Sequence, residues 1–464
     1  MGQKNIAIIG AGLAGLTAAY ELRNSGAGVD VYEATDRLGG KLYTVAFEAG
    51  PTDMGAEAFM ARRRDAVEFF TELGLGDSLV EPSGLRSLVY VDGEARQLPT
   101  GGVMGIPSTS ETVAHLVGEE TAARIDAERD AEGFEWEIGG DANVGKLVRE
   151  RYGDEVVDNI VTPLLGGVYS CTADDLGVRA TIPQLAGELD RLAADGKVSL
   201  SQAIANLEQS RREMPTGHGA VFNAFRDGYQ ELYEELAEQS GADIYIDAFV
   251  SAIERTDGGF RLKGGEDTVY DHVILAVPAP TAALLLKPLA PEASEALQMV
   301  KLANSAVVGM RFATDTGLPQ NSGVLVATGE SVNAKAFTFS SRKWPHLAER
   351  GGALVRASFG RFGDNVALTA TEDDLVDWAL DDLKTITGFD GREAGLEEIY
   401  VQRWFGGLPR FDEHHLATVA EVKNKLADVE GISVTGAWAA GVGVPAVVAD
   451  ARAVAGNVEK QLLA

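Results

Sequence analysis

The first forty residues contain short apolar runs separated by a glycine-rich turn. Residues 6–9 are all apolar, GAGLAG follows at 10–15, and an apolar-faced segment continues to about Asn24. A second run, VDVYE at 29–33, ends on an acid. Short apolar runs bounded by turn signals predict buried strands, and the longer segment predicts a helix. The opening is therefore expected to fold as strand, helix and strand.

The same pattern divides the rest of the chain into a helical middle and strand-rich flanks. An amphipathic helix is predicted at 65–73, a hairpin at 87–98 around Asp92-Gly93, and mostly helix from 108 to 213. Further helices are predicted at 373–387 and from about Ala446. The remaining predicted strands are 244–253, 259–262, 269–277, 305–312, 323–327, 336–340, 353–359 and 432–434.

Charge and composition narrow the function classes. The 464 residues hold 40 Lys and Arg against 70 Asp and Glu, a formal net charge of −30. Such a surface repels nucleic acid and anionic lipid. Because no apolar stretch approaches the length of a spanning helix and the opening lacks a signal-peptide layout, we expect a cytoplasmic protein with no transmembrane segment. The single cysteine, Cys171, excludes an intrachain disulfide.

The opening carries a dinucleotide-binding pattern in its required context. Gly10 permits a tight turn, Gly12 lets the backbone approach a pyrophosphate, and Gly15 lets the helix pack closely on the strand. The helix start, with Leu13 and Ala14, offers unpaired N–H groups to phosphates. The carboxylate of Glu33 is expected to accept hydrogen bonds from a ribose. NAD(P) and FAD both fit this pattern.

The residues after Glu33 and Ala34 favour FAD. Arg37, Gly39, Gly40 and Lys41 form an RxGG sequence that resembles the second element of the large FAD-containing amine oxidase superfamily. In this resemblance Arg37 reaches the pyrophosphate, and the glycines let the chain pass beside the flavin. The other predicted cofactor-binding residues are Gly55, Ala56, Glu57, Val250, Ala276, Trp404, Gly436, Ala437, Gly443 and Val444.

Several stretches along the chain resemble one family in particular. They are GAGLAG at 10–15, RLGGK at 37–41, GAEAF at 55–59, LPTG at 98–101, MGIP at 104–107, GDEVV at 153–157, PLLGGVY at 163–169, KWPH at 343–346, RW at 403–404 and GVGVP at 441–445. These stretches resemble the flavin-dependent protoporphyrinogen/coproporphyrinogen oxidases of heme synthesis, and most closely the Gram-positive, actinobacterial type. PLLGGVY and LPTG with MGIP are the most specific of them. Ser170-Cys171 and Gly228-Tyr229 depart from the family's usual residues.

The resemblance implies a fold and a reaction. The fold is α/β, with an FAD-binding Rossmann-like domain of the GR2, p-hydroxybenzoate hydroxylase-like type, a mixed-sheet substrate domain and a helical lobe. The FAD-binding domain is expected at 1–60, 215–278 and 400–464, the substrate domain at 61–107 and 279–399, and the helical domain at 108–214. Noncovalent FAD takes electrons from coproporphyrinogen III in three two-electron rounds, and oxygen reoxidises the flavin to give hydrogen peroxide.

The substrate side is predicted from residue chemistry within this resemblance. Arg63 and Arg64 belong to the densest basic cluster and suit the propionates of a porphyrinogen; Arg179 is a third candidate. Tyr169 and Met104 are expected to provide apolar walls for the macrocycle. Hydride transfer to flavin depends on orientation more than on a strong acid or base, so no catalytic residue is assigned. The adjacent His414 and His415 cannot complete a metal site by themselves, and no metal is predicted.

Alternatives remain open at this level. Protoporphyrinogen IX oxidase is the nearest, followed by an amine oxidase or carotenoid desaturase on the same fold. A non-catalytic binding protein, like the Rab escort and GDP-dissociation-inhibitor relatives, is the alternative from another class. The expected partners are the porphyrinogen and O2, with transient contact to other heme-pathway enzymes.

Overall fold

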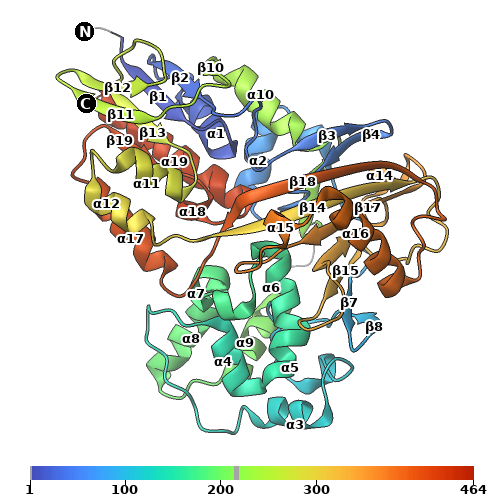
Figure 1. Cartoon of the computed structure of the whole chain (residues 1–464). Helices are drawn as coiled ribbons and strands as arrows, with labels where there is room; N and C mark the ends of the chain where they lie inside the picture. The colour runs from blue at the N-terminus through green and yellow to red at the C-terminus, as the bar shows by residue number, and fades with distance from the viewer. Residues whose placement is uncertain (1–2, 214–218, 464) are drawn as a thin grey trace. The chain divides into compact units, whose positions relative to one another are not determined.

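The computed structural model describes residues 3–213 and 219–463 (Figure 1). These residues form two compact units, each assembled from separate stretches of the chain. The first unit comprises the described residues of 1–81, 219–301 and 417–464, and the second comprises those of 82–218 and 302–416.

The first unit is built on a five-stranded parallel sheet. Its strand order is β10-β2-β1-β13-β19. The strands are β1 (Asn5–Ile9), β2 (Gly28–Tyr32), β10 (Asp243–Tyr245), β13 (His272–Leu275) and β19 (Ile432–Val434). Parallel strands need crossover connections, and α1 (Leu13–Leu22) supplies the one between β1 and β2. Strands from both ends and the middle of the sequence thus meet side by side.

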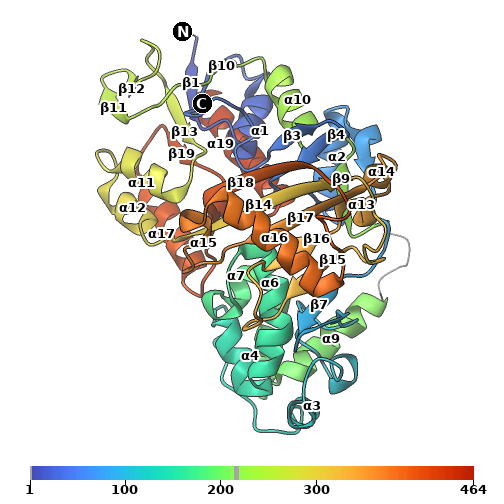
Figure 2. The ribbon, with the colours of Figure 1, turned by 45° about the vertical axis from the view of Figure 1, so that its right-hand side comes forward.

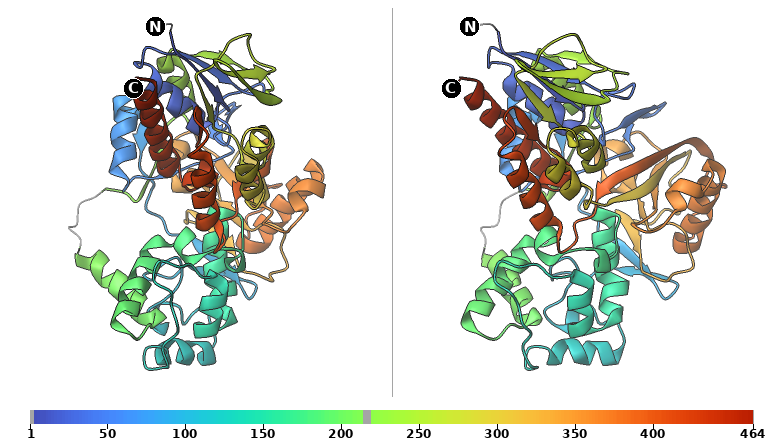
Figure 3. Two further views of the ribbon diagram at one scale, coloured as in Figure 1. Left: turned by 90° about the vertical axis from the view of Figure 1, so that its left-hand side faces the viewer. Right: turned by 60° about the vertical axis from the view of Figure 1, so that its left-hand side comes forward.

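Helices cover this sheet and form the core of the first unit. α1 packs against α10 (Gln230–Ser240) and the C-terminal α19 (Val444–Leu463), which lies beside it in Figure 3. The α1 helix is almost completely buried because its sequence, LAGLTAAYEL, has apolar residues on nearly every face. The core also takes in Phe69 and Phe70 from α2 (Arg64–Glu72).

Smaller elements complete the first unit. The strands are β3 (Thr44–Phe47), β4 (Gly50–Asp53), β5 (Phe59–Met60), β6 (Leu79–Val80), β9 (Phe222–Phe225), β11 (Ala252–Thr256) and β12 (Gly259–Lys263). The helices are η1 (Gly76–Ser78), α11 (Ala279–Leu286), α12 (Pro291–Leu297), α18 (Ala437–Ala440) and α17 (His415–Leu426), most of which belongs to this unit.

The second unit contains a seven-stranded mixed sheet. Its order is β18-β14-β17-β16-β15-β7-β8, antiparallel throughout except between β15 and β7. The strands are β7 (Leu88–Val91), β8 (Glu94–Gln97), β14 (Leu302–Phe312), β15 (Gly323–Val326), β16 (Ala336–Thr338), β17 (Ala353–Phe359) and β18 (Leu396–Pro409). The apolar side of α16 (Glu372–Thr387) covers one face of this sheet (Figure 2).

The helical part of the second unit runs from residue 110 to 213. Its elements are η2 (Ser110–Thr112), α3 (Glu119–Ala127), α4 (Val144–Tyr152), α5 (Asp154–Val156), the π-helical turn η3 (Val157–Val161), α6 (Thr162–Tyr169), η4 (Ala173–Asp175), α7 (Val178–Thr181), α8 (Pro183–Asp195) and α9 (Leu200–Glu213). Three short helices lie elsewhere in this unit: α13 (Ser340–Lys343), α14 (Pro345–Ala348) and α15 (Val366–Thr369).

The predicted elements are confirmed with one exception. A single strand at 244–253 is wrong: the chain forms β10, leaves the strand conformation near Asp247, whose φ is +52°, and starts β11 at Ala252. β10 extends the parallel sheet, whereas β11 pairs with β12. Among the described elements that were not predicted, β18 is the longest strand. Its charged residues and the Gly406-Gly407 pair obscure the alternation expected of a strand.

The two units and the three predicted domains divide the chain differently. Residues 61–81, predicted in the substrate domain, belong to the first unit, and residues 110–213 belong with the mixed sheet to the second. The assignment of three functional domains stays a prediction. Within the described part of the chain, no helix combines the length and apolarity that crossing a membrane requires.

Candidate active site

The turn between β1 and α1 is packed so closely that two of its glycines admit no side chain. A Cβ on Gly15 would lie 1.9 Å from the Gly10 carbonyl oxygen. Gly10 has a φ of +104°, and a Cβ there would lie 2.5 Å from the carbonyl oxygen of Ala276. The Gly10 N–H donates to Tyr32 O at 2.8 Å. The predicted residues Gly10, Gly15 and Ala276 therefore meet at the carboxyl ends of the strands.

The RxGG loop lies directly against the start of α1. Gly12 and Gly39 form a parallel bridge, and the Gly39 N–H donates to Ala11 O at 2.9 Å. A Cβ on Gly40 would lie 2.9 Å from the Gly12 Cα, so the two backbones approach as only glycines allow. Gly12 caps α1 with no side-chain hydrogen bond, and its first turn, with Leu13 and Ala14, holds no acid. This helix start is open to an anion.

Glu33 lies beside the same turn. Its carboxylate accepts from the Ala11 N–H at 2.9 Å and from the Thr35 N–H and hydroxyl, each at 2.9 Å. The segment that leads to Val250 runs alongside, because the Ala248 N–H donates to Glu33 O at 2.8 Å. The neighbouring Ala34 is exposed. The acid is thus fixed at the position where the dinucleotide pattern requires it.

Arg37 organises its own loop. Nη1 donates to Leu38 O at 3.0 Å and to Leu42 O at 3.1 Å, and Nη2 donates to Gly40 O at 2.7 Å. The guanidinium also lies over the Tyr43 ring, 4.2 Å from its centroid. We therefore assign Arg37 the role of holding the RxGG loop; contact with a pyrophosphate stays a prediction. The pKa of the Lys41 ammonium is lowered, first by desolvation near the loop and second by the Arg37 charge.

The remaining predicted cofactor residues of the first unit border its core or open space. Gly55, Ala56 and Glu57 follow β4 and are half-buried; Ala56 packs against the core. A Cβ on Gly436 would meet no atom within 4 Å, and one on Gly443 would approach only Pro445 Cδ, at 3.9 Å. Ala437 begins α18 and Val444 begins α19. At both helix starts the backbone is left accessible.

In the second unit, the structure brings together the two most family-specific stretches of the sequence. The MGIP turn is closed by reciprocal 3.0 Å hydrogen bonds between Val103 and Ile106. It presses on the helix that contains PLLGGVY, since a Cβ on Gly105 would lie 2.7 Å from Ile160 Cγ2 and 2.8 Å from Leu164 Cδ1. Met104 has a φ of +48° and is partly exposed.

Tyr169 ends α6 at the other side of this helix. Its ring contacts Phe411 at a centroid distance of 5.9 Å, and desolvation raises the pKa of its hydroxyl to about 12. The aromatic ring is therefore presented as a neutral, mostly apolar surface. That suits a wall for a macrocycle, and this role stays a prediction.

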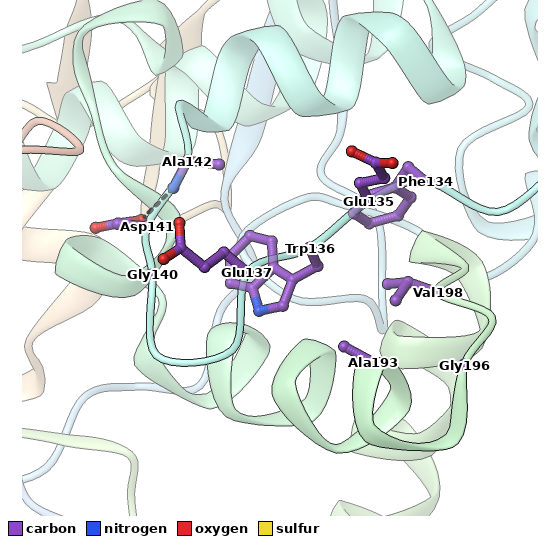
Figure 4. Close-up of a pocket in the computed structure, with 10 residues that line it drawn as sticks. All are labelled: Phe134, Glu135, Trp136, Glu137, Gly140, Asp141, Ala142, Ala193, Gly196 and Val198. Carbon is purple, nitrogen blue, oxygen red and sulfur yellow. Dashed lines mark hydrogen bonds between the residues drawn. The ribbon is translucent and has the colours of Figure 1, made fainter.

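Arg179 is engaged in an ion pair within the helical part. Nη2 donates to both carboxylate oxygens of Asp190, at 2.7 and 2.9 Å, and Nε donates to Gly140 O at 2.6 Å. Gly140 and Trp136, whose ring centroid is 6.0 Å from the guanidinium, line a surface pocket of about 660 Å³ (Figure 4). Other lining residues include three acids, Glu135, Glu137 and Asp141. These contacts indicate that Arg179 supports the fold.

The other predicted site residues lie apart from these clusters. Arg63 precedes α2 and pairs with Asp65, with Nη2 2.6 Å from Oδ2. Arg64 begins α2 and is exposed. Trp404 is buried in β18 of the second unit. No described contact assigns a ligand to these three residues, and their roles stay predictions. The described residues contain no group of three or more His, Cys, Asp and Glu arranged to hold a metal.

Sequence reasoning missed two cations in the second unit. Lys335 is 5% exposed, and its Nζ donates to Ser170 Oγ at 2.6 Å and to Gly360 O at 2.5 Å. Arg361 follows Gly360, and its Nε is buried without a hydrogen-bond partner. A lysine directly before the predicted strand 336–340 is the one signal that pointed to a buried cation.

The first unit fits FAD on its own geometry. A Cβ on Gly40 would collide with the Gly12 Cα, so only glycines let the RxGG loop lie against the start of α1, and the N-cap Gly12 makes no side-chain cap hydrogen bond there. The fixed Glu33 carboxylate completes the pattern. These residues match an anionic dinucleotide bound by backbone groups.

Comparison with known proteins agrees with this geometry. The model of the flavin containing amine oxidoreductase family matches residues 13–458. Coproporphyrinogen III oxidase of Mycobacterium tuberculosis is 41% identical over 467 aligned residues, covering 99% of this chain and 98% of that protein. The protein of the same name from Bacillus subtilis is 28% identical, covering 96% and 95%. The crystal structure of a putative protoporphyrinogen oxidase from Exiguobacterium superposes with a TM-score of 0.86 at 28% identity, covering 99% of this chain and 100% of that one.

The match to the family model spans almost the whole chain, and the same chain carries the glycine cradle, the RxGG loop and the fixed acid. The chain belongs to the flavin-containing amine oxidoreductase family, and its cofactor is FAD.

Proposed function

We propose that this chain oxidises coproporphyrinogen III to coproporphyrin III in heme synthesis. The observation that carries the proposal is the contact at Gly105, where the MGIP turn meets the PLLGGVY helix. In the resemblance drawn from the sequence, these two stretches are the ones most specific to the porphyrinogen oxidases. The full-length similarity to proteins named coproporphyrinogen III oxidase supports the same substrate.

The residues of the second unit are suited to a large, flat, apolar ring. Val168 is 45% exposed on α6, and the adjacent Gly167 has no side chain to interrupt the surface. Tyr169 follows Val168 at the end of α6, and Met104 precedes Gly105, which packs against Leu164 of the same helix. Such a surface orients a macrocycle and excludes water from it, which is the main requirement for hydride transfer.

Bound FAD supplies the two-electron acceptor chemistry. The protein holds it through the N–H groups at the start of α1, the Glu33 carboxylate and the loop organised by Arg37. The buried Cys171, whose thiol pKa desolvation raises to about 12, is not a thiolate at neutral pH. A buried, protonated thiol is not suited to form a covalent bond to the flavin, which supports noncovalent attachment.

We further propose O2 as the electron acceptor, with one H2O2 released for each two-electron round. Six electrons and six hydrogens leave the macrocycle over three rounds, so three O2 are consumed for each coproporphyrin formed. We also propose a cytoplasmic location, with which the single cysteine agrees, and transient contacts to other enzymes of heme synthesis.

The test is anaerobic mixing of the purified yellow protein with each porphyrinogen while the flavin absorbance is followed. We expect coproporphyrinogen III to bleach the flavin and oxygen to restore it. Protoporphyrinogen IX is the second candidate, because the Exiguobacterium structure carries the name protoporphyrinogen oxidase. Bleaching by protoporphyrinogen IX alone would transfer the function to that substrate.

A further inference from the structure

The corner formed by α6, β16 and β17 contains two cations that share no carboxylate. Lys335 precedes β16, and Arg361 follows β17 two residues after its end. Neither forms an ion pair with any described carboxylate. The charge of Asp364 acts on both cations at a distance. Its carboxylate oxygens accept hydrogen bonds from the backbone N–H groups of Arg361 and Val366, at 3.2 and 2.6 Å. In a chain with a net charge of −30, such a pair of cations is unusual.

Arg361 is the less satisfied of the two. Its Nε is buried with no hydrogen-bond partner, and its Nη2 has only Val326 O, at a distant 3.5 Å. A buried donor without an acceptor costs about 1–3 kcal/mol, more when it is charged. Burial lowers the pKa of the guanidinium, although it remains charged at neutral pH. An arginine held in this way is prepared for an acceptor that the chain itself does not provide.

The position of Arg361 relates it to the predicted macrocycle wall. A Cβ on Gly166 would lie 3.6 Å from Arg361 Nε, and the Phe362 N–H donates to Ser170 O at 2.7 Å. The guanidinium is therefore next to α6, one residue from the exposed Gly167 and Val168. Even with a side chain at 166, the 3.6 Å separation would be an ordinary van der Waals contact, so the guanidinium lies directly against this part of the helix.

Lys335 links the end of α6 to the backbone next to Arg361. It is 5% exposed, and its Nζ bridges Ser170, which ends α6 in the left-handed conformation, to the carbonyl of Gly360, the residue before Arg361. The groups that act on its ammonium are Arg361, Cys171 and Asp364. Lys335 is thus a positioning residue that also adds a second positive charge.

We propose that Arg361 binds a carboxylate of the substrate, one propionate of the porphyrinogen, and that Lys335 positions Arg361 and strengthens its field. This rests on the proposed function, because the wall beside Arg361 is the surface assigned there to the macrocycle. A guanidinium suits a carboxylate through two parallel hydrogen bonds, and Nε is one of the donors available for them.

Binding of coproporphyrin III to the holoenzyme, measured by porphyrin fluorescence, tests this directly. We expect Arg361→Gln to raise Kd by about tenfold or more, because a charge-assisted pair is lost, and Arg361→Lys to recover part of that loss. The tetramethyl ester of coproporphyrin III, which carries no charge, should bind wild type and Arg361→Gln equally. Arg392→Gln, at an exposed arginine paired with Asp377 and Asp381, is the matched control and should change neither value.

The pH dependence gives a second readout that does not depend on an Arg361 variant. Burial lowers the pKa of Lys335 to about 7, so its charge is lost as the pH rises through neutrality. We expect wild-type Kd for coproporphyrin III to increase from pH 6 to pH 8, and Lys335→Met to remove most of that increase.

The outcomes separate this inference from the proposed function. If wild type binds coproporphyrin III and coproporphyrinogen III bleaches its flavin, but Arg361→Gln binds as tightly as wild type, the inference fails alone. It also fails if Arg361→Gln weakens binding of the ester as much as that of the acid, since that result indicates a structural role. If wild type neither binds the porphyrin nor reacts with the porphyrinogen, both proposals fail.

Discussion

Arg37 and Arg361 both lie beside paired glycines, yet the structure uses their guanidinium groups in opposite ways. Arg37 donates to three carbonyls of its own loop and lies over Tyr43, so it holds a backbone surface in place. Arg361 has a buried donor without a partner. In the first unit the binding groups are therefore backbone N–H groups that side chains hold in place. In the second unit the binding group is a buried guanidinium donor that has no partner within the chain.

This comparison suggests why the two regions differ. A dinucleotide is recognised by N–H groups whose geometry must exist before binding, so the side chains nearby are used to hold the loop. A carboxylate on a flexible propionate is recognised by a charge, and leaving that charge unsatisfied in the free protein avoids competition. The predictions below test this contrast, from the largest expected effect to the smallest.

The largest effect is expected at the cradle. Gly15→Ala places a Cβ 1.9 Å from the Gly10 carbonyl oxygen and 3.3 Å from Ala276 Cβ, so turn and helix must separate. We expect nearly complete loss of bound flavin and a loss of stability of at least about 3 kcal/mol, measured as flavin content and thermal unfolding. Gly187→Ala, inside α8 with no atom within 4 Å of the added Cβ, should instead stabilise by about 0.5–1 kcal/mol. A Gly15→Ala protein with full flavin content would refute the cradle.

The second effect is a pH dependence of stability caused by Lys335. Its folded-state pKa is lowered from 10.5 to about 7 by burial, so between these values the unfolded chain binds the proton that the folded chain has released. Stability of wild type should therefore rise with pH above 7, relative to Lys335→Met, by about 1.4 kcal/mol per pH unit.

Chemical denaturation of both proteins from pH 6 to pH 9 measures this difference. Below pH 7 the curves should run parallel, because both states of wild type carry the charge. Lys287→Met, at an exposed lysine, is the control. A constant difference across the whole range would show that Lys335 is not held in the environment described.

Comparing Arg37→Gln with Arg361→Gln tests the difference between the two arginines directly. Arg37→Gln removes the hydrogen bonds that hold the RxGG loop, and we expect flavin affinity to fall by about tenfold. Arg361→Gln should keep full flavin content. The matched control is Arg23→Gln, at an arginine of the first unit that also lies over a ring, Tyr20, and donates to its carbonyl. Equal flavin loss in both test variants would remove the distinction between the two regions.

The smallest effect concerns Arg179, which pairs with Asp190. Arg179→Gln should cost about 1–2 kcal/mol of stability, since a half-buried ion pair and the bond to Gly140 O are lost, while KM for the porphyrinogen stays unchanged. Arg191→Gln breaks a more exposed pair with Glu188 and should cost clearly less stability than Arg179→Gln. A raised KM in Arg179→Gln would restore its role in substrate binding.

Prediction from the sequence succeeded where the requirement is local. Gly10, Gly12 and Gly15 lie within six residues, and their need for a tight turn follows from the spacing alone. It failed at 244–253, where an apolar pattern continued through a change of sheet, and at β18, whose exposure pattern is irregular. At Arg37 the motif was found, but the acceptors of its guanidinium are carbonyls, which no pattern of side chains reveals.

The sequence by itself determined the dinucleotide turn, because glycines and an acid at fixed spacing restrict the backbone wherever they occur, and the resemblance of the RxGG stretch at 37–41 indicated FAD and the family. Only the tertiary structure decided what happens to Lys335 and Arg361. Ser170 and Lys335 are 165 positions apart and meet only in the folded chain. Lys335 is buried by elements that are distant in sequence, and this burial is what lowers the pKa of its ammonium.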